Sequence, residues 1–182
     1  MSIHVNFSRK IRTITIVAII STTGFAAYLS GADSSKYKHG SFNFDLDKKY
    51  PVEDVLDGDT FEIKTDDGLK TIRMLGIDTP ETVDPRKPVQ CFGKEASDMT
   101  KSLLQFHSVN LKIDKTQSSV DKFGRLLAYV YRDDELFVNE YLLRNGFARE
   151  YTYSKKYSFQ KQFKVLQSEA KKSLAGLWKI CN

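Results

Sequence analysis

The sequence predicts an α+β fold in which a small closed antiparallel barrel of five strands is accompanied by three helices. Five short runs with β-type alternation are separated by turn signals, a helical repeat lies between the third and fourth runs, and two more follow the fifth. The chain has 182 residues, 41% of them hydrophobic, which is enough for one core and a tight fit for two. Periodicity alone is also compatible with another α+β sandwich.

The strands are predicted from their alternation and from the turns that bound them. The five runs cover residues 51–56, 60–65, 70–75, 109–114 and 126–132. The turn sequences are Asp57-Gly58, Asp66-Asp67-Gly68 and Asp121-Lys122-Phe123-Gly124. Because the first two turns are short, the first three strands are expected to form a meander.

The helices are predicted from apolar residues that recur at intervals of three or four positions. The first covers residues 93–106, the second 137–145 and the third 159–177. Gly146 is a typical residue to end the second helix. We interpret the apolar and aromatic stripes of these helices as parts of the core.

The N-terminal residues carry a targeting pattern. Three basic residues within 9–12 precede residues 14–32, which contain no charged side chain. The apolar stretch is short and is followed by small polar residues, so residues 1–32 are predicted to be a signal peptide or an N-terminal membrane anchor. Cleavage would give a secreted or periplasmic protein. Retention of residues 11–29 as a membrane span would leave the body anchored, outside the cytoplasm.

The rest of the chain is predicted to divide into a polar linker, residues 33–48, and a domain, residues 49–182. The whole chain has 28 basic and 23 acidic residues, a formal net charge of +5. Three of the basic residues belong to the leader, which leaves 25 basic against 23 acidic residues in the body. Such a small excess does not by itself indicate a nucleic-acid partner, so individual residues must carry that inference.

Cys91 and Cys181 are the only cysteines of the chain. An even count in an exported protein favours a disulfide over the alternative of two free thiols. The bond would close a loop of about 90 residues, for which loop entropy gives at most roughly 4–5 kcal/mol of stabilisation. The histidines lack the spacing to form a metal site with these cysteines.

Charged side chains are concentrated near the ends of two predicted strands. Asp59 follows the first turn, whereas Arg73 and Asp78 flank an apolar run and Glu81 comes three residues later. Three converging carboxylates would repel one another unless a cation bound them, and oxygen ligands favour Ca²⁺ or Mg²⁺. Arg73 and Arg125 offer rigid guanidinium forks for a phosphate. Taken singly, each feature is more often an ordinary turn or a surface ion pair.

Together these segments resemble the three signature segments of the thermonuclease family, that is, staphylococcal-nuclease-like proteins. The matching segments are Asp57-Gly58-Asp59-Thr60, Arg73 to Glu81 and Asp121 to Arg125, and the similarity extends from Val52 to Trp178. The three motifs in this order are specific, although any one of them alone would not be. The resemblance implies an oligonucleotide-binding fold (OB-fold), a five-stranded antiparallel barrel with three helices.

The resemblance also implies a calcium-dependent endonuclease that hydrolyses DNA and RNA and leaves 3′-phosphate ends. Asp59 and Asp78 would bind Ca²⁺ through their carboxylates, and Thr79 through its main-chain carbonyl. Glu81 would position or deprotonate the attacking water. The expected partners are single-stranded or denatured DNA and RNA, and the protein is expected to be a monomer.

Substrate contacts follow from the same resemblance. Arg73 and Arg125 would bind the phosphodiester and stabilise the charge that develops on it. The nucleotide pocket would be formed by Asp121, Lys122, Phe123, Tyr151 and Tyr153. Phe123 departs from the tyrosine common in the family, which removes a hydroxyl contact but keeps base stacking. The alternative to an enzyme is a non-catalytic OB-fold module that binds nucleic acid, although such a module would be expected to lose the carboxylates or an arginine.

Overall fold

The computed structural model describes residues 36–39, 42–85, 88–153 and 155–181. The predicted signal peptide or anchor, residues 1–32, lies outside these ranges. Within them, no helix combines the length and the apolar character needed to cross a membrane.

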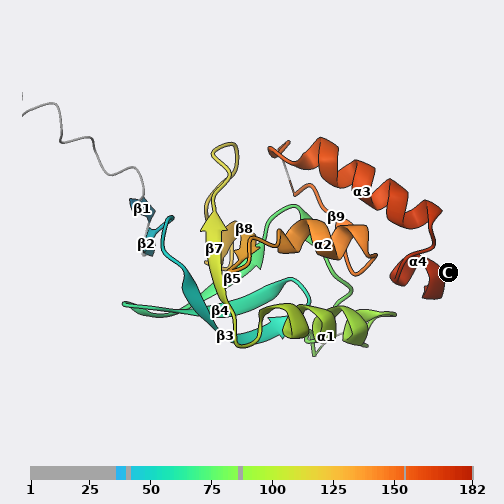
Figure 1. Ribbon diagram of the computed structural model, residues 1–182, viewed down its shortest axis with the longest axis horizontal. Helices are drawn as coiled ribbons and strands as arrows, with labels where there is room; N and C mark the ends of the chain where they lie inside the picture. The colour runs from blue at the N-terminus through green and yellow to red at the C-terminus, as the bar shows by residue number, and fades with distance from the viewer. Residues whose placement is uncertain (1–35, 40–41, 86–87, 154, 182) are drawn as a thin grey trace, which may run out of the picture. The chain divides into compact units, whose positions relative to one another are not determined.

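Five strands close into a barrel in the order β3-β4-β5-β8-β7 (Figure 1). The strands are β3 (Tyr50–Asp57), β4 (Thr60–Thr65), β5 (Gly68–Met74), β7 (Ser108–Lys112) and β8 (Leu126–Arg132). All five predicted strands are therefore confirmed, with small shifts at their ends. The α+β barrel with helices is confirmed as the fold class.

One strand pair corrects the prediction of a wholly antiparallel barrel. β5 and β8 are parallel, with Ile72 opposite Leu126. The other four neighbouring pairs in the barrel are antiparallel. The reason is topological, because a closed ring with an odd number of strands cannot reverse direction at every neighbour. The chain enters β8 only after passing through a helix and β7, and this crossover connection permits the parallel pairing.

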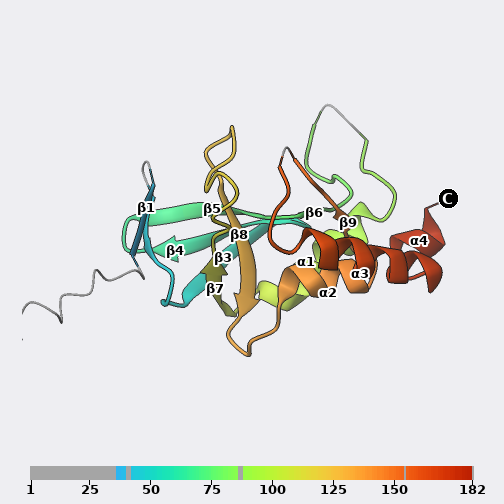
Figure 2. The same ribbon diagram turned by 90° about the horizontal axis from the view of Figure 1, so that it is seen from above.

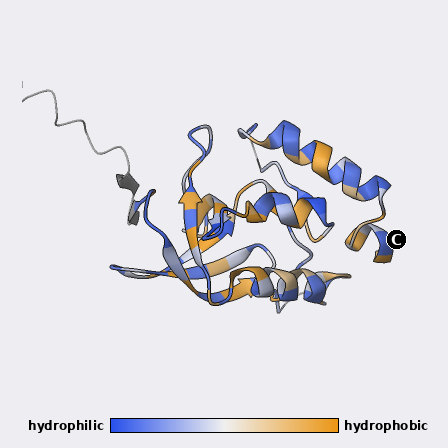
Figure 3. Ribbon diagram, in the orientation of Figure 1, coloured by the Kyte–Doolittle hydropathy of each residue, from blue (hydrophilic) through white to orange (hydrophobic). Residues whose placement is uncertain are grey.

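The helices cluster at one end of the barrel, as Figure 2 shows. They are α1 (Gly93–Leu104), α2 (Val138–Arg144), α3 (Gln160–Lys172) and α4 (Leu177–Ile180). In Figure 3 apolar stretches recur between polar ones along α1, α2 and α3. Their buried apolar residues include Ala96, Leu103, Leu142, Phe163 and Leu166. These side chains extend the core outward from the barrel interior.

The third predicted helix, residues 159–177, is wrong in its extent, because α3 ends at Lys172 and a separate short helix, α4, begins only at Leu177. Between the two helices, Leu174 and Gly176 adopt positive φ values of 53° and 51°. Gly176 lies so close to Gly146 that an added Cβ would come within 2.4 Å of the Gly146 carbonyl oxygen. The close approach requires glycine at position 176, and the positive φ values keep the chain between α3 and α4 out of a continuous helix.

The predicted linker, residues 33–48, contains two strands. β1 (Lys36–His39) pairs antiparallel with β2 (Phe42–Asp45). The two phenylalanines of β2 favour extended structure, which the polar composition of the whole segment obscures. The end of β2 is bonded to the barrel, since the Tyr50 hydroxyl of β3 accepts the Asp45 N–H at 2.7 Å.

A buried asparagine fixes α2 against the strand segment that leads to the functional residues. Asn139 is fully buried. Its Oδ1 accepts the Val130 N–H of β8, and its Nδ2 donates to the Leu75 carbonyl, both at 2.9 Å. The residues after Leu75 form β6 (Ile77–Asp78), which pairs with β9 (Arg149–Glu150). These contacts hold the chain between β5 and β6 in one position.

A disulfide joins Cys91 to Cys181, with the two Cα atoms 5.9 Å apart. The disulfide predicted from the even number of cysteines is therefore present, and the alternative of two free thiols is wrong. Cys91 lies just before α1 and Cys181 directly follows α4. The bond therefore ties the chain ahead of the first helix to the C-terminal residues.

Candidate functional site

A cleft lies between the β3–β4 turn, the segment from β5 to Glu81 and two later loops, with a volume of about 680 Å³. It is lined by every residue predicted to bind metal or to act in catalysis: Asp59, Arg73, Asp78, Thr79, Glu81 and Arg125. The predicted nucleotide-binding residues Asp121, Lys122, Phe123, Tyr151 and Tyr153 line it as well. The fold thus brings residues from distant parts of the chain to one cleft.

Arg73 lies between two of the acidic side chains. Its Nη2 is 3.1 Å from Asp59 Oδ2 and 2.9 Å from Asp78 Oδ1. Its Nη1 donates to the carbonyls of Met74 at 2.6 Å and Ile77 at 2.8 Å. Only 12% of the side chain is exposed. The two carboxylates and the two carbonyls hold the guanidinium in one orientation.

Strand register explains why these charged groups meet. β4 pairs with β5 so that Thr60 is opposite Arg73, and the Met74 N–H donates to the Asp59 carbonyl at 2.9 Å. Asp78 comes from β6, where it is opposite Arg149. The two carboxylates therefore approach Arg73 from different strand pairs.

The carboxylate of Asp59 organises the chain that follows β6. Its Oδ2 accepts the Thr79 N–H at 2.9 Å, and its Oδ1 accepts the Thr60 hydroxyl at 2.9 Å. Thr79 packs over Gly58, where an added Cβ would lie 2.7 Å from Thr79 Oγ1. Glycine at this turn thus permits the Thr79 main chain to lie beside the Asp59 carboxylate. That the Thr79 carbonyl is a metal ligand stays a prediction.

The environment of Asp78 favours a nearby cation. Burial raises the pKa of this carboxyl, and the negative charges of Asp59 and Glu81 raise it further. The positive charges of Arg73 and Arg149 act in the opposite direction but do not cancel the rise. A cation bound between these acids would lower their mutual repulsion and favour the ionised forms.

The donor set fits a hard cation such as Ca²⁺, because it consists of oxygen atoms only. Within the described ranges, no group of three Asp, Glu, His or Cys side chains is placed to hold a metal ion together. The three predicted carboxylates line one cleft, but Asp59 and Asp78 share Arg73 whereas the Glu81 carboxylate is bonded to main-chain N–H groups of its own loop. Two carboxylates with main-chain and water ligands would give a weak, exchangeable site.

Glu81 begins the loop that leads to α1. Its Oε1 accepts the N–H groups of Val83 at 2.8 Å and Asp84 at 3.1 Å. Burial acts to raise its pKa, but these two bonds outweigh it, with smaller contributions from Asp57 and Thr82, and the pKa lies below its ordinary value. Glu81 is therefore ionised at neutral pH, as a group must be to accept a proton from water.

Asp57 is a cleft residue that the sequence placed in a turn and in the first signature segment, without a role of its own. It is 7% exposed, and its Oδ1 accepts the Gly58 N–H at 2.8 Å and the Thr82 hydroxyl at 2.6 Å. Burial raises the pKa of this carboxyl, and the charges of Asp59 and Glu81 add to the rise. The signal was present as two carboxylates two positions apart, but an Asp-Gly turn gives the same local pattern.

Arg125 is oriented by Asp121 in the turn before β8. Asp121 Oδ2 accepts Arg125 Nε at 2.7 Å, and Oδ1 accepts the main-chain N–H groups of Phe123 and Arg125. Arg125 Nη1 lies 3.4 Å from Thr60 Oγ1, beside Asp59. The Asp121 carboxylate, predicted to bind nucleotide, is thus engaged in holding the turn and the arginine.

Three aromatic side chains on the rim of the cleft are exposed. The exposed fractions are 71% for Phe123, 44% for Tyr151 and 68% for Tyr153, and the two tyrosine rings are 6.3 Å apart. Lys122 Nζ and the Arg125 guanidinium lie 5.0 Å and 5.2 Å from the Phe123 ring centroid. Exposed rings next to cations are typical of surfaces that stack bases without reading their sequence.

Comparison with known proteins gives a consistent result. Residues 71–180 match the family described as staphylococcal nuclease homologue. A thermonuclease of Staphylococcus hyicus is 40% identical over 146 residues, which cover 80% of this chain and 85% of that protein. A thermonuclease of Staphylococcus intermedius is 37% identical over 171 residues, covering 93% and 98%. Endonuclease YncB of Bacillus subtilis is 37% identical over 150 residues, covering 82% and 67%.

Proposed function

Because the chain belongs to the staphylococcal nuclease family, we propose that it is a calcium-dependent, exported endonuclease that cleaves DNA and RNA to 3′-phosphate ends. It is a nuclease that hydrolyses phosphodiester bonds, as its motifs predicted. The main support for the fuller proposal is that one cleft holds two carboxylates suited to a cation and two oriented guanidinium groups. The alternative of a non-catalytic binding module is not supported, since the named relatives are nucleases.

The proposed mechanism assigns the acidic residues to the metal and the water. Asp59 and Asp78 would hold Ca²⁺ together with the Thr79 carbonyl, and the bound ion would supply Lewis-acid polarisation of a phosphoryl oxygen. Glu81 would accept a proton from the attacking water or orient it. The water oxygen would form a bond to phosphorus as the bond to the 5′ oxygen breaks. The 5′ oxygen would take up a proton from solvent, which leaves a 3′-phosphate and a 5′-hydroxyl.

Arg73 and Arg125 would bind the phosphodiester and stabilise the negative charge that accumulates on its oxygens. Donors that are already oriented need little rearrangement at that moment, and this preorganisation is what makes them effective. The exposed rings of Phe123, Tyr151 and Tyr153 would stack on bases, which a single strand offers more readily than a duplex. Denatured DNA and RNA are therefore the proposed substrates. We also propose that the enzyme acts as a monomer.

The first test of this proposal is calcium dependence. We expect the full chain to cleave heat-denatured DNA and RNA when Ca²⁺ is present and to lose this cleavage when a chelator removes the ion. Electrophoresis with 3′-end analysis measures both the rate and the product. Cleavage that persists unchanged in excess chelator would contradict the role of Asp59 and Asp78.

The second test concerns export. We propose that residues 1–32 direct the domain out of the cytoplasm, with cleavage giving a secreted or periplasmic enzyme. The expected result is a mature protein whose mass lacks these residues. A full-length mass in the membrane fraction would instead establish anchoring through residues 11–29. A full-length cytoplasmic protein would contradict both forms of the proposal.

A further inference from the structure

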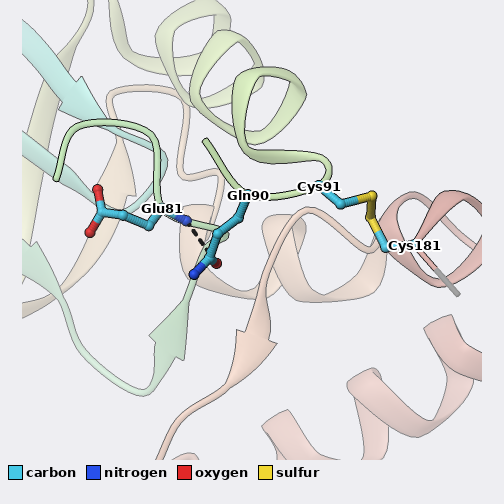
Figure 4. Close-up of a disulfide and its surroundings, with 4 residues drawn as sticks. All are labelled: Glu81, Gln90, Cys91 and Cys181. Carbon is cyan, nitrogen blue, oxygen red and sulfur yellow. Dashed lines mark hydrogen bonds between the residues drawn. A yellow bond between two sulfur atoms is a disulfide. The ribbon is translucent and has the colours of Figure 1, made fainter. Parts of the chain in front are cut away.

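Glu81 and Gln90 lie near the two ends of the loop that connects β6 to α1. We call this pair of residues the neck of the loop. The Gln90 N–H donates to the Glu81 carbonyl at 3.0 Å, and the Glu81 N–H donates to Gln90 Oε1 at 3.1 Å. Figure 4 shows the Gln90 amide turned toward the Glu81 main chain, while the Glu81 carboxylate points away from it. One residue thus bonds both the N–H and the carbonyl of Glu81.

Gln90 directly precedes Cys91, which is one of the two disulfide-bonded cysteines. The disulfide connects Cys91 to Cys181, whose N–H donates to the Leu177 carbonyl of α4 at 2.9 Å. Leu177 is fully buried, and its N–H donates to the Gly146 carbonyl at 2.9 Å. The disulfide therefore anchors the neck of the loop to a packed part of the fold (Figure 4).

The other side of Gln90 is also held. The Gly93 N–H donates to the Gln90 carbonyl at 2.9 Å as α1 begins. Gly93 is buried against Thr82, where an added Cβ would lie 2.8 Å from Thr82 Cγ2. The first residue of the helix thus packs on the residue that follows Glu81.

We propose that Gln90 is a positioning residue for Glu81, and that the Cys91–Cys181 disulfide keeps Gln90 in place. This inference rests on the proposed function, in which Glu81 handles the attacking water. The Glu81 carboxylate is bonded to the N–H groups of Val83 and Asp84, so its location follows the main chain at the neck. Gln90 does not line the cleft, and it therefore acts through Glu81 and not through the substrate.

The physical reason for a covalent anchor is the exposure of the neck. Gln90 is exposed, and water competes for its hydrogen bonds with Glu81. The disulfide removes alternative positions of Gln90, so the same two bonds form more often. Small displacements of a catalytic group have large effects on rate, because the reacting atoms must be aligned.

The test compares Gln90→Leu, which removes the acceptor for the Glu81 N–H, with Gln90→Glu, which keeps an acceptor oxygen. In the full chain with Ca²⁺ and denatured DNA, we expect Gln90→Leu to lower kcat by about 10-fold with little change in KM. Gln90→Glu should restore most of the rate. The double variant Cys91→Ser/Cys181→Ser should lower kcat in the same direction, and adding Gln90→Leu to it should have less than the additive effect.

The matched control is Gln162→Leu. Gln162 is also exposed and donates one side-chain hydrogen bond, to Glu140 Oε2 at 2.8 Å, away from the cleft. Its replacement should leave kcat unchanged. Thermal unfolding of each variant, measured at the assay conditions, separates a loss of rate from a loss of folded protein.

A second readout is independent of activity. Amide hydrogen exchange of the Glu81 N–H, followed by NMR, should accelerate in Gln90→Leu and return toward the wild-type rate in Gln90→Glu. Unchanged exchange and unchanged kcat in Gln90→Leu would overturn the proposal, as would a loss confined to KM. If the wild type does not cleave nucleic acid, the proposed function fails, and exchange at Glu81 still reports whether Gln90 holds it.

Discussion

Replacing either Arg73 or Arg125 by lysine is expected to lower kcat/KM by about 100-fold. A lysine keeps the positive charge but loses the planar fork, which donates in two fixed directions at once. Arg73 uses both of its terminal nitrogens, with Nη2 near two carboxylates and Nη1 on two carbonyls. An ammonium group lacks this planar arrangement of donors and cannot reproduce all of these contacts. Steady-state hydrolysis of a short denatured DNA measures the effect.

The two arginine variants should differ in stability. Arg73→Lys disturbs the bonds that hold Asp59 and Asp78, whereas the ion pair of Arg125 is confined to the turn with Asp121. The midpoint temperature of thermal unfolding should therefore fall further for Arg73→Lys than for Arg125→Lys. Arg144→Lys is the matched control, because Arg144 is on α2 and pairs with Glu140 outside the cleft. Near-normal turnover in both cleft variants would mean that neither arginine stabilises the transition state.

Glu81→Gln is expected to lower kcat by about 100-fold or more, because the amide cannot accept a proton from water. In the wild type, the pKa of the Glu81 carboxyl lies below the ordinary value of a glutamate. Burial acts to raise it, but hydrogen bonds from main-chain N–H groups outweigh that effect. The ionised form is present above that lowered pKa and is lost as the pH falls through it. Activity that depends on Glu81 should consequently persist at neutral and mildly acidic pH. Measuring kcat against pH for wild type and Glu81→Gln tests this.

The control for the loss of one carboxylate is Glu53→Gln. Glu53 is exposed on β3 and does not line the cleft, so its replacement should change neither kcat nor the pH profile. A Glu81→Gln enzyme with wild-type kcat and an unaltered profile would exclude Glu81 as the group that handles the attacking water.

Much of the fold was predictable because its signals are local. Alternation and turn residues identified the five barrel strands, and helical spacing identified the chain segments of α1, α2 and α3. The extent of the last helix was not predictable in this way, since it depends on the contact between Gly146 and Gly176. The strands β1 and β2 were missed because a polar segment conceals its short extended runs.

The site residues were predictable as a set, but not in their individual arrangement. The signature segments identified Asp59, Arg73, Asp78, Glu81 and Arg125, all of which line the cleft. The sequence did not reveal that Asp57 is buried in the same cleft or that Glu81 is bonded apart from the other two acids. The burial of Asp57 depends on the distant Thr82, whereas the bonds of Glu81 to Val83 and Asp84 are local but depend on the loop conformation, which the motif does not specify.

The amino-acid sequence alone therefore establishes the family signature, the order of strands and helices, and the even number of cysteines. Each of these depends on residues near one another in the chain or on simple counts. Long-range pairing establishes the rest. It makes β5 and β8 parallel, brings Arg125 next to Thr60 of β4, and connects Cys181 through Cys91 and Gln90 to Glu81. These contacts form only when the barrel closes and the C-terminal helices pack against it, so the positions of the reactive groups are properties of the folded chain.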